Sequence, residues 1–257
     1  MTYRKLLALI PLLAVVASSA PLSFNEEFSS PVLDPAWTVQ PGVGAYSLAS
    51  VPGSLQYQLT STTFPGDGNA LWIHRPFDGT QWTLNAFGSY TFPGGTGRQL
   101  YVRVLFGDLT AKGVNDAIFY HDFDFPADRK KIVGSFSDGG WLGGEVAGFG
   151  GDPARWFANS STPPSSWYFR FTRDGQEIAI QTSLDGLVFS DLVRRTFTTP
   201  LDPTQILLIS GASFSSEGGT ASYDYFRLQS DAIPEPATWT IVAGGLGLLV
   251  LRCRARS

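Results

Sequence analysis

The sequence predicts an all-β protein, built as an antiparallel β-sandwich between two non-globular ends. Several short segments alternate apolar and polar residues, the pattern of a strand with one buried face. The 28 glycines and 17 prolines among 257 residues indicate frequent turns. No long helical periodicity is visible between the ends. A central region of about 200 residues is large enough to form one core.

The N-terminus has the order of features of a secretory signal peptide. Arg4 and Lys5 precede an apolar run at residues 6–16, and small residues follow. An apolar run of about 11 residues is shorter than the ~20 that a spanning helix needs, although a single N-terminal anchor is the alternative. We expect a cleaved signal peptide at residues 1–19, a β-sandwich domain at 20–231 and a separate tail at 232–257.

Four candidate strands lie in the first half of the central region. Their sequences are SLQYQLT (residues 54–60), QLYVRVLF (99–106), AIFYHDF (117–123) and KIVGSFS (131–137). In residues 99–106, every second residue from Leu100 to Phe106 is apolar, while Tyr101 and Arg103 fall on the opposite face. This alternation predicts a strand with one face in the core and the other in water.

The second half contains the clearest hairpin, WYFRFTRDGQEIAIQ (residues 167–181). Asp174-Gly175 between two alternating runs predicts a type I′ turn, in which both central residues have positive φ. A second turn is expected at SLDG (183–186). The continuous run ILLI (206–209) predicts a strand covered on both sides.

The segment ASYDYFRL (221–228) is expected to close the domain as its last strand. Simple alternation places Tyr223 and Tyr225 on one face of this strand and Phe226 and Leu228 on the other.

Short motifs in this region resemble the concanavalin A-like lectin/glucanase superfamily. They are FNEEF (24–28) with LDPAW (33–37), the RDG (173–175) and SLDG (183–186) turns, and DYFRL (224–228). The resemblance implies a large jelly-roll sandwich of two antiparallel sheets. It also implies that sugar binding and sugar hydrolysis are the functions to consider.

Catalytic motifs are absent from the sequence. Retaining glycosidases of this superfamily use a Glu-x-Asp-x-x-Glu strand, which places two carboxylates ~5 Å apart, and the chain contains no such pattern. There is no Gly-x-Ser-x-Gly elbow. The single cysteine, Cys253, lies in the tail, so the domain has no thiol for a disulfide, a zinc site or a nucleophile. We therefore expect a protein that is not an enzyme.

Ligand-binding candidates are aromatic and acidic residues. Trp141 and Trp156 bracket a glycine-rich segment, so they are candidate platforms for stacking on sugars, with packing as the alternative. Asp116, Asp122 and Asp124 form the densest cluster of oxygen ligands and are candidates for a structural calcium ion, with solvated strand-end acids as the alternative. Two distant histidines make no zinc site, and a net charge of −4 without a basic stripe predicts no nucleic-acid partner.

The C-terminal tail has three parts in a fixed order. They are Pro234-Glu235-Pro236, an apolar run at residues 237–251, and a basic cluster of Arg252, Arg254 and Arg256. As a helix the apolar run would be about 22 Å long, short of the ~30 Å hydrocarbon core of a membrane. The arginines would stay on the cytoplasmic side.

This tail resembles the PEP-CTERM sorting signal. The resemblance implies recognition by an exosortase-type membrane enzyme, transient anchoring in the inner membrane, and delivery to the cell surface or outside the cell. It also implies an organism that makes extracellular polysaccharide. A plain tail anchor and a buried core helix are the alternatives. The sequence thus predicts an exported surface or matrix protein, non-catalytic and a candidate for glycan binding, with a glycoside hydrolase, a polysaccharide lyase or a purely structural protein as alternatives.

Overall fold

The structure is a computed structural model that describes residues 23–59, 70–91, 98–107, 115–124, 129–137, 154–157, 165–213 and 219–230. The expected signal peptide and sorting tail lie outside the described residues, and so does Trp141. In the described part of the chain, no helix is long and apolar enough to cross a membrane.

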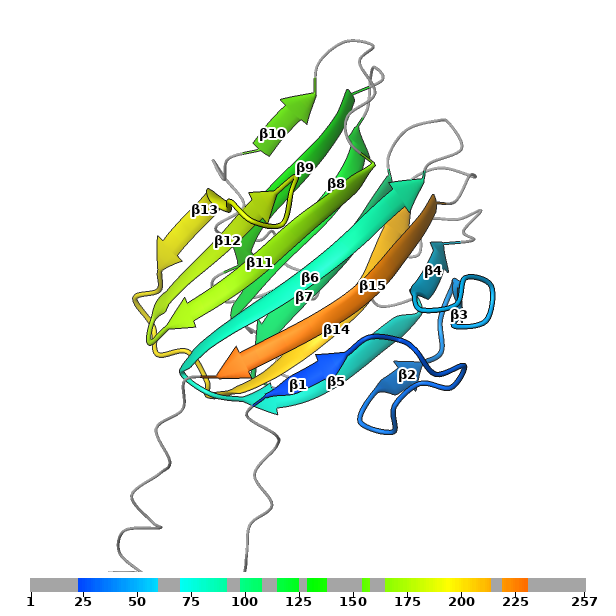
Figure 1. The fold of residues 1–257 in the computed structure, drawn as a ribbon. Coiled ribbons are helices and arrows are strands. Elements are labelled where there is room, and N and C mark those ends of the chain that lie inside the picture. Colours follow the sequence, from blue (N-terminus) through cyan, green and yellow to red (C-terminus); the bar gives the residue numbers. More distant parts are fainter. Residues whose placement is uncertain are drawn as a thin grey trace, which may run out of the picture.

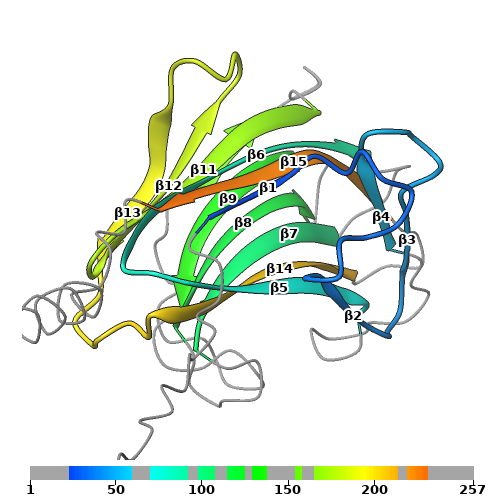
Figure 2. The same cartoon turned by 60° about the horizontal axis from the view of Figure 1, so that its bottom comes forward.

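The described residues form two antiparallel sheets packed face to face (Figure 1). Sheet A has the strand order β13-β12-β11-β6-β15-β4-β3, with β1 also paired to β15. Sheet B has the order β10-β9-β8-β7-β14-β5-β2. Figure 2 shows the sheets as two layers, with β11, β6 and β15 above β8, β7 and β14.

The strand bounds are as follows. Sheet A contains β1 (Phe24–Glu26), β3 (Ala45–Ser47), β4 (Leu55–Leu59), β6 (Gln81–Thr91), β11 (Ser166–Asp174), β12 (Glu177–Ser183), β13 (Ser190–Thr196) and β15 (Gly219–Ser230). Sheet B contains β2 (Thr38–Gln40), β5 (Trp72–Asp78), β7 (Arg98–Phe106), β8 (Asn115–Asp124), β9 (Arg129–Ser137), β10 (Ala154–Phe157) and β14 (Thr204–Ser213).

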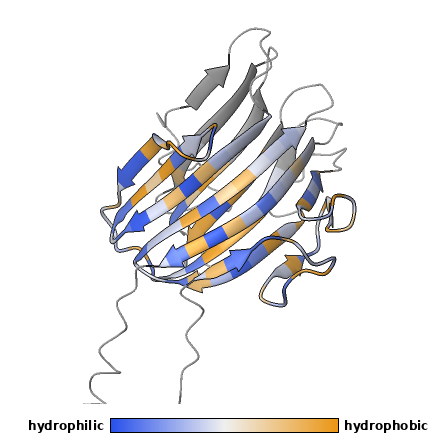
Figure 3. Ribbon diagram, viewed as in Figure 1, coloured by the Kyte–Doolittle hydropathy of each residue, from blue (hydrophilic) through white to orange (hydrophobic). Residues whose placement is uncertain are grey.

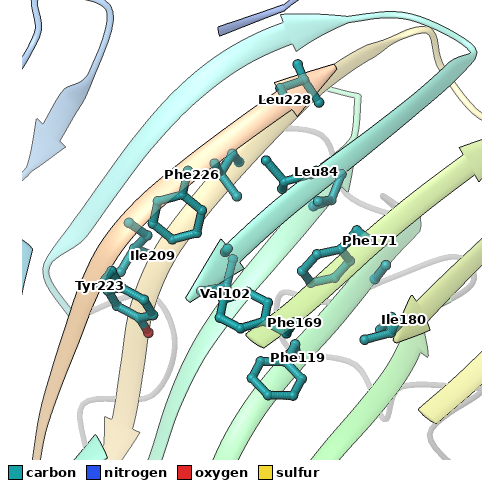
Figure 4. Close-up of a cluster of buried hydrophobic side chains, with 14 of the residues drawn as sticks. Leu84, Val102, Phe119, Phe169, Phe171, Ile180, Ile209, Tyr223, Phe226 and Leu228 are labelled. Atoms are coloured by element: carbon teal, nitrogen blue, oxygen red, sulfur yellow. The ribbon is translucent and has the colours of Figure 1, made fainter. Parts of the chain in front are cut away.

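The main core lies between the sheets and is built from alternate residues of both. Figure 3 shows apolar and polar residues alternating along the strands of sheet A. In the core, the ring of Phe169 from β11 stacks on that of Phe119 from β8, with centroids 4.5 Å apart (Figure 4). Such a stack joins the two sheets directly. The expected strands at residues 99–106, 117–123 and 131–137 are confirmed as β7, β8 and β9.

Strand β14 is covered on both faces, as the ILLI run predicted. Leu207 and Ile209 belong to the main core. Ile206 and Leu208 belong to a second apolar cluster on the opposite face of sheet B.

Two local expectations were wrong by one residue. The last pair of the β11–β12 hairpin is Asp174 with Glu177, so the central residues of the turn are Gly175 and Gln176. Only Gly175 has a positive φ (+60°), which is the pattern of a type II′ turn rather than type I′. Asp174 stays in the strand, where it accepts a hydrogen bond from Gln81 on β6.

In β15 the pairing with β6 shifts between Tyr223 and Tyr225. This bulge breaks simple alternation, because an extra residue is inserted on one strand. Tyr223 therefore lies in the core with Phe226, and Tyr225 lies on the outer face of sheet A, where alternation had put both tyrosines together.

The motifs that resemble the lectin/glucanase superfamily hold the sandwich together. Arg173 is buried and donates four hydrogen bonds to the backbone carbonyls of Gly175, Gly79, Asp202 and Leu201. In the N-terminal motif, one oxygen of Glu26 accepts a bond from the Trp37 indole and the other from the Phe28 amide. Both motifs are structural.

Candidate functional site

The outer face of sheet B, which points away from sheet A, is shielded from solvent. Tyr101 and Arg103 on β7 were expected in water, but they are only 2% and 6% exposed. This face carries two apolar clusters: Trp72, Leu105 and Leu208 with Ala70 and Ile206, and separately Tyr101 with Ile118. Arg103 also packs its guanidinium 4.4 Å from the ring of Tyr101. The described part of this face is a packed surface.

The predicted calcium candidates Asp116, Asp122 and Asp124 all lie on strand β8, but at different positions along it. Asp116 is fully buried near the start of the strand. Asp122 lies six residues further along, about 20 Å at the rise of an extended strand, so it does not share an ion with Asp116. Asp122 and Asp124 remain a prediction, because their side chains lie outside the described part. Among the described residues, no group of three His, Cys, Asp or Glu side chains is placed to hold a metal ion.

Of the two tryptophan candidates, Trp156 has a described backbone. It lies in the edge strand β10, paired with Lys131 of β9. Its side chain and the whole of Trp141 are outside the described residues, so their role as a sugar platform stays a prediction.

Sequence reasoning missed an aromatic feature on the outer face of sheet A. Tyr225 on β15 lies opposite Phe87 on β6, and Phe87 lies opposite Tyr168 on β11. All three side chains are half-buried, and the rings of Phe87 and Tyr168 are 4.6 Å apart. We call these three residues the aromatic strip; at the usual strand spacing it is about 10 Å across.

Hydrogen-bonding side chains flank the aromatic strip on both sides. On one side, the register aligns Arg227, Asn85, Arg170 and Gln181 in a row across β15, β6, β11 and β12. On the other side, Ser222, Ser89 and Ser166 face outward in a second row. The strip therefore combines apolar ring surface with amide, guanidinium and hydroxyl groups.

The two arginines of the first row differ in their partners. Arg227 makes a bidentate ion pair with Glu27, at 2.6 and 2.9 Å, and lies 4.1 Å over the ring of Tyr225. Arg170 donates its Nε–H to Asn85 at 2.7 Å and stacks 3.8 Å from the ring of Phe189. Burial lowers the pKa of Arg170 and raises the pKa of Tyr225.

The loop between β12 and β13 closes one end of the strip. A Cβ on Gly186 would lie 2.9 Å from the ring of Tyr168, so the loop backbone is packed directly on this ring. Asp185 fixes the loop by accepting bonds from the backbone amides of Val188 and Leu187, which lower the pKa of its carboxyl to about 2. Leu184, Leu187 and Val188 project from the loop and are exposed.

A polar pocket of about 340 Å³ lies near the β11–β12 turn. It contains two carboxylates, and both are engaged. Glu177 is ion-paired with Arg194, and Asp174 accepts a bond from Gln81 at 2.9 Å. These contacts hold the ends of β6, β11, β12 and β13 together, so the pocket is explained by strand packing.

Comparisons with known proteins identify the fold. No protein-family model matches the chain, and no curated protein matches it by sequence. Solved structures do match. A laminarinase from Flavobacterium sp. UMI-01 has a TM-score of 0.56 at 12% identity, covering 82% of this chain and 100% of that one. The lectin UEA-II, solved with galactose, has a TM-score of 0.55 at 12% identity, covering 83% and 100%.

The GH43 protein BlXynB from Bacillus licheniformis matches with a TM-score of 0.54 at 12% identity. The match covers 80% of this chain and 39% of that one, so this chain spans about two fifths of the GH43 protein. At these identities the comparisons show the fold alone. The chain has the concanavalin A-like sandwich, a fold shared by lectins and glycoside hydrolases, as its motifs predicted.

Proposed function

We propose that this protein binds polysaccharide at the aromatic strip of sheet A and is not an enzyme. The observation that carries this proposal is the strip itself. Sugars are held by aromatic rings together with a few directed hydrogen bonds. Tyr225, Phe87 and Tyr168 supply the rings, and the two flanking rows supply donors and acceptors. A lectin solved with galactose has the same fold.

The described carboxylates of sheet B support a non-catalytic role. Asp78 and Asp116 are the acids of known side-chain position on its outer face, and they lie on β5 and β8 with β14 and β7 between. Three strand spacings separate them by about 14 Å. Glycosidase acid pairs are ~5–9.5 Å apart. The second candidate, a glycoside hydrolase or polysaccharide lyase, is favoured by the likeness to the laminarinase.

Export and sorting complete the proposal. Residues 1–19 act as a cleaved signal peptide, and Pro234-Glu235-Pro236 is the handle for an exosortase-type enzyme. Arg252, Arg254 and Arg256 hold the tail at the cytoplasmic side of the inner membrane until it is processed, after which the protein reaches the cell surface or matrix. Phe24 in β1 pairs with Leu228 in β15, so both flanking segments join the sandwich at neighbouring strands.

A polysaccharide-binding screen of the purified full-length protein tests the binding function. We expect Tyr168→Ala and Tyr225→Ala each to weaken binding at least about tenfold, because each removes a ring of the strip. Tyr46→Ala is the matched control, since Tyr46 is an exposed tyrosine on β3 at the far edge of the same sheet. Equal effects of all three changes, or no bound sugar at all, would contradict the proposal. Release of new reducing ends would favour the hydrolase.

Cell fractionation and mass spectrometry of the mature C-terminus test the sorting. We expect the surface fraction to lack residues after the Pro-Glu-Pro triplet. Glu235→Ala should leave the intact chain in the inner membrane. An intact tail on the surface protein would argue for a plain anchor.

A further inference from the structure

The arginines on the outer face of sheet A differ in whether a carboxylate compensates their charge. Arg227 is paired with Glu27, and Arg194 is paired with both Glu177 and Asp191. Their guanidinium charges are therefore compensated within the protein, as is usual for surface arginines beside carboxylates.

Among the residues that the structure describes, no carboxylate compensates Arg170 in this way. Among the described residues its polar partner is the amide oxygen of Asn85, which is neutral and takes only the Nε–H. Its flat face is covered by the ring of Phe189. A guanidinium has five N–H donors in a rigid fork, so both Nη groups retain donors for a ligand. Arg170 adjoins the aromatic strip, two residues from Tyr168 on the same face of β11.

Two acids on this outer face, Glu27 and Asp191, are engaged by other arginines. Glu27 and Asp191 pair with Arg227 and Arg194. Asp224 lies at the β15 bulge, where burial raises the pKa of its carboxyl. The whole chain carries a net charge of −4, so long-range attraction does not draw a polyanion to it. Of the arginines on this outer face that the structure describes, Arg170 alone lacks a carboxylate partner, so an anionic group is favoured there.

We propose that the aromatic strip selects acidic polysaccharides, by stacking a sugar on the strip and pairing an anionic substituent with the guanidinium fork of Arg170. The substituent is a carboxylate or a sulfate ester, since each presents two neighbouring oxygens that accept two parallel N–H bonds. This inference rests on the proposed binding function and adds the class of ligand.

Titration calorimetry of the full-length protein with matched polymer pairs tests the selection. One pair is polygalacturonate and its methyl ester, which share a backbone and differ in the carboxylate. The other is dextran sulfate and dextran. We expect one charged polymer to bind at least about tenfold tighter than its neutral partner, the range of a hydrogen bond to a charged group. The pair that shows the preference identifies the substituent.

Three variants locate the effect. Arg170→Gln should abolish the charge preference while weak binding of the neutral polymer remains. Arg170→Lys keeps the charge but loses the planar fork, so it should retain only part of the preference. Arg194→Gln is the matched control, because it removes one positive charge from the same sheet and should leave the preference unchanged. Melting temperatures near that of the unaltered protein verify that the variants fold.

The outcomes separate the two proposals. Equal binding of charged and neutral polymers, or equal loss in Arg170→Gln and Arg194→Gln, overturns the selection but leaves the binding function standing. Absence of binding to any polymer overturns the binding function itself.

Discussion

Replacement of Arg173 by methionine should destabilise the sandwich severely. Arg173 is 3% exposed, and its guanidinium donates four hydrogen bonds of 2.9 to 3.1 Å to backbone carbonyls. These carbonyls belong to the β11–β12 turn, the β5–β6 turn and the segment before β14. One side chain thus ties together three chain segments that are distant in sequence. Burial lowers the pKa of Arg173 to about 10, so it stays protonated at neutral pH.

The expected loss follows from the number of bonds. At about 1 kcal/mol for each of four bonds, Arg173→Met should lower the free energy of unfolding by about 4 kcal/mol. This is a large part of the ~5–15 kcal/mol that stabilises a typical domain. Urea unfolding measures the loss, provided that the slope with denaturant is unchanged.

Two control variants sharpen this experiment. Arg173→Lys keeps the charge but cannot reach all four carbonyls. Its free energy of unfolding should therefore lie about midway between those of the unaltered protein and Arg173→Met. Arg194→Met removes a half-exposed arginine and should change stability by about 1 kcal/mol or less. A loss below about 1 kcal/mol in Arg173→Met would refute the view that this motif is a structural clamp.

Three further outcomes follow from the structure. Gly134→Ala should cost about 1–3 kcal/mol in urea unfolding, because its Cβ would lie 2.6 Å from Val193 Cγ1; an unchanged midpoint would contradict this packing. Phe119→Ala should cost about 3–5 kcal/mol, because it removes the ring stacked on Phe169, and calorimetry should show the lower melting temperature. The folded pKa of Asp185 is below its ordinary value of 3.8, so the stabilisation of its loop is complete above that pH and is lost as pH falls toward 2; NMR titration should give a midpoint near 2, and one near 3.8 would disprove the loop contacts.

Strand positions could be read from the sequence because alternation is a local property. In β7 the apolar residues recur at every second position, and the structure places them all in the core. Shifts of one residue in a turn or in strand register could not be predicted, because they depend on partners elsewhere in the chain. Asp174 pairs with Glu177 of β12 and with Gln81 of β6, 93 residues away, so it belongs to the strand and the turn begins one position later.

The outer face of sheet B shows a second limit of sequence reasoning. Tyr101 and Arg103 alternate with core residues, so a single strand predicts that they face water. In the structure both are buried: Tyr101 forms a cluster with Ile118 of β8, and Arg103 lies beside Leu208 of β14. Alternation along one strand predicts on which face of the sheet a residue lies. Whether that face is exposed to water depends on the other strands.

The aromatic strip could not be found from the sequence, because Phe87, Tyr168 and Tyr225 meet only through the register of three strands. The bulge in β15 is essential here, since without it Tyr225 would share the inner face with Tyr223. The large ring of tryptophan makes it a candidate for sugar binding in a sequence, but Trp37, Trp72, Trp82 and Trp167 are all buried.

Cross-strand packing alone explains the strip poorly. An aromatic pair across two strands contributes only about 0.2–1 kcal/mol, and β-branched residues would stabilise the same positions comparably. Three rings in register on an outer face also leave apolar surface partly exposed to water, and this does not stabilise the folded state. Beside them, Arg170 keeps its charge without an acidic partner among the described residues, where Arg194 and Arg227 have one. Ring surface and an uncompensated guanidinium at one place are both accounted for by a ligand that stacks and carries negative charge.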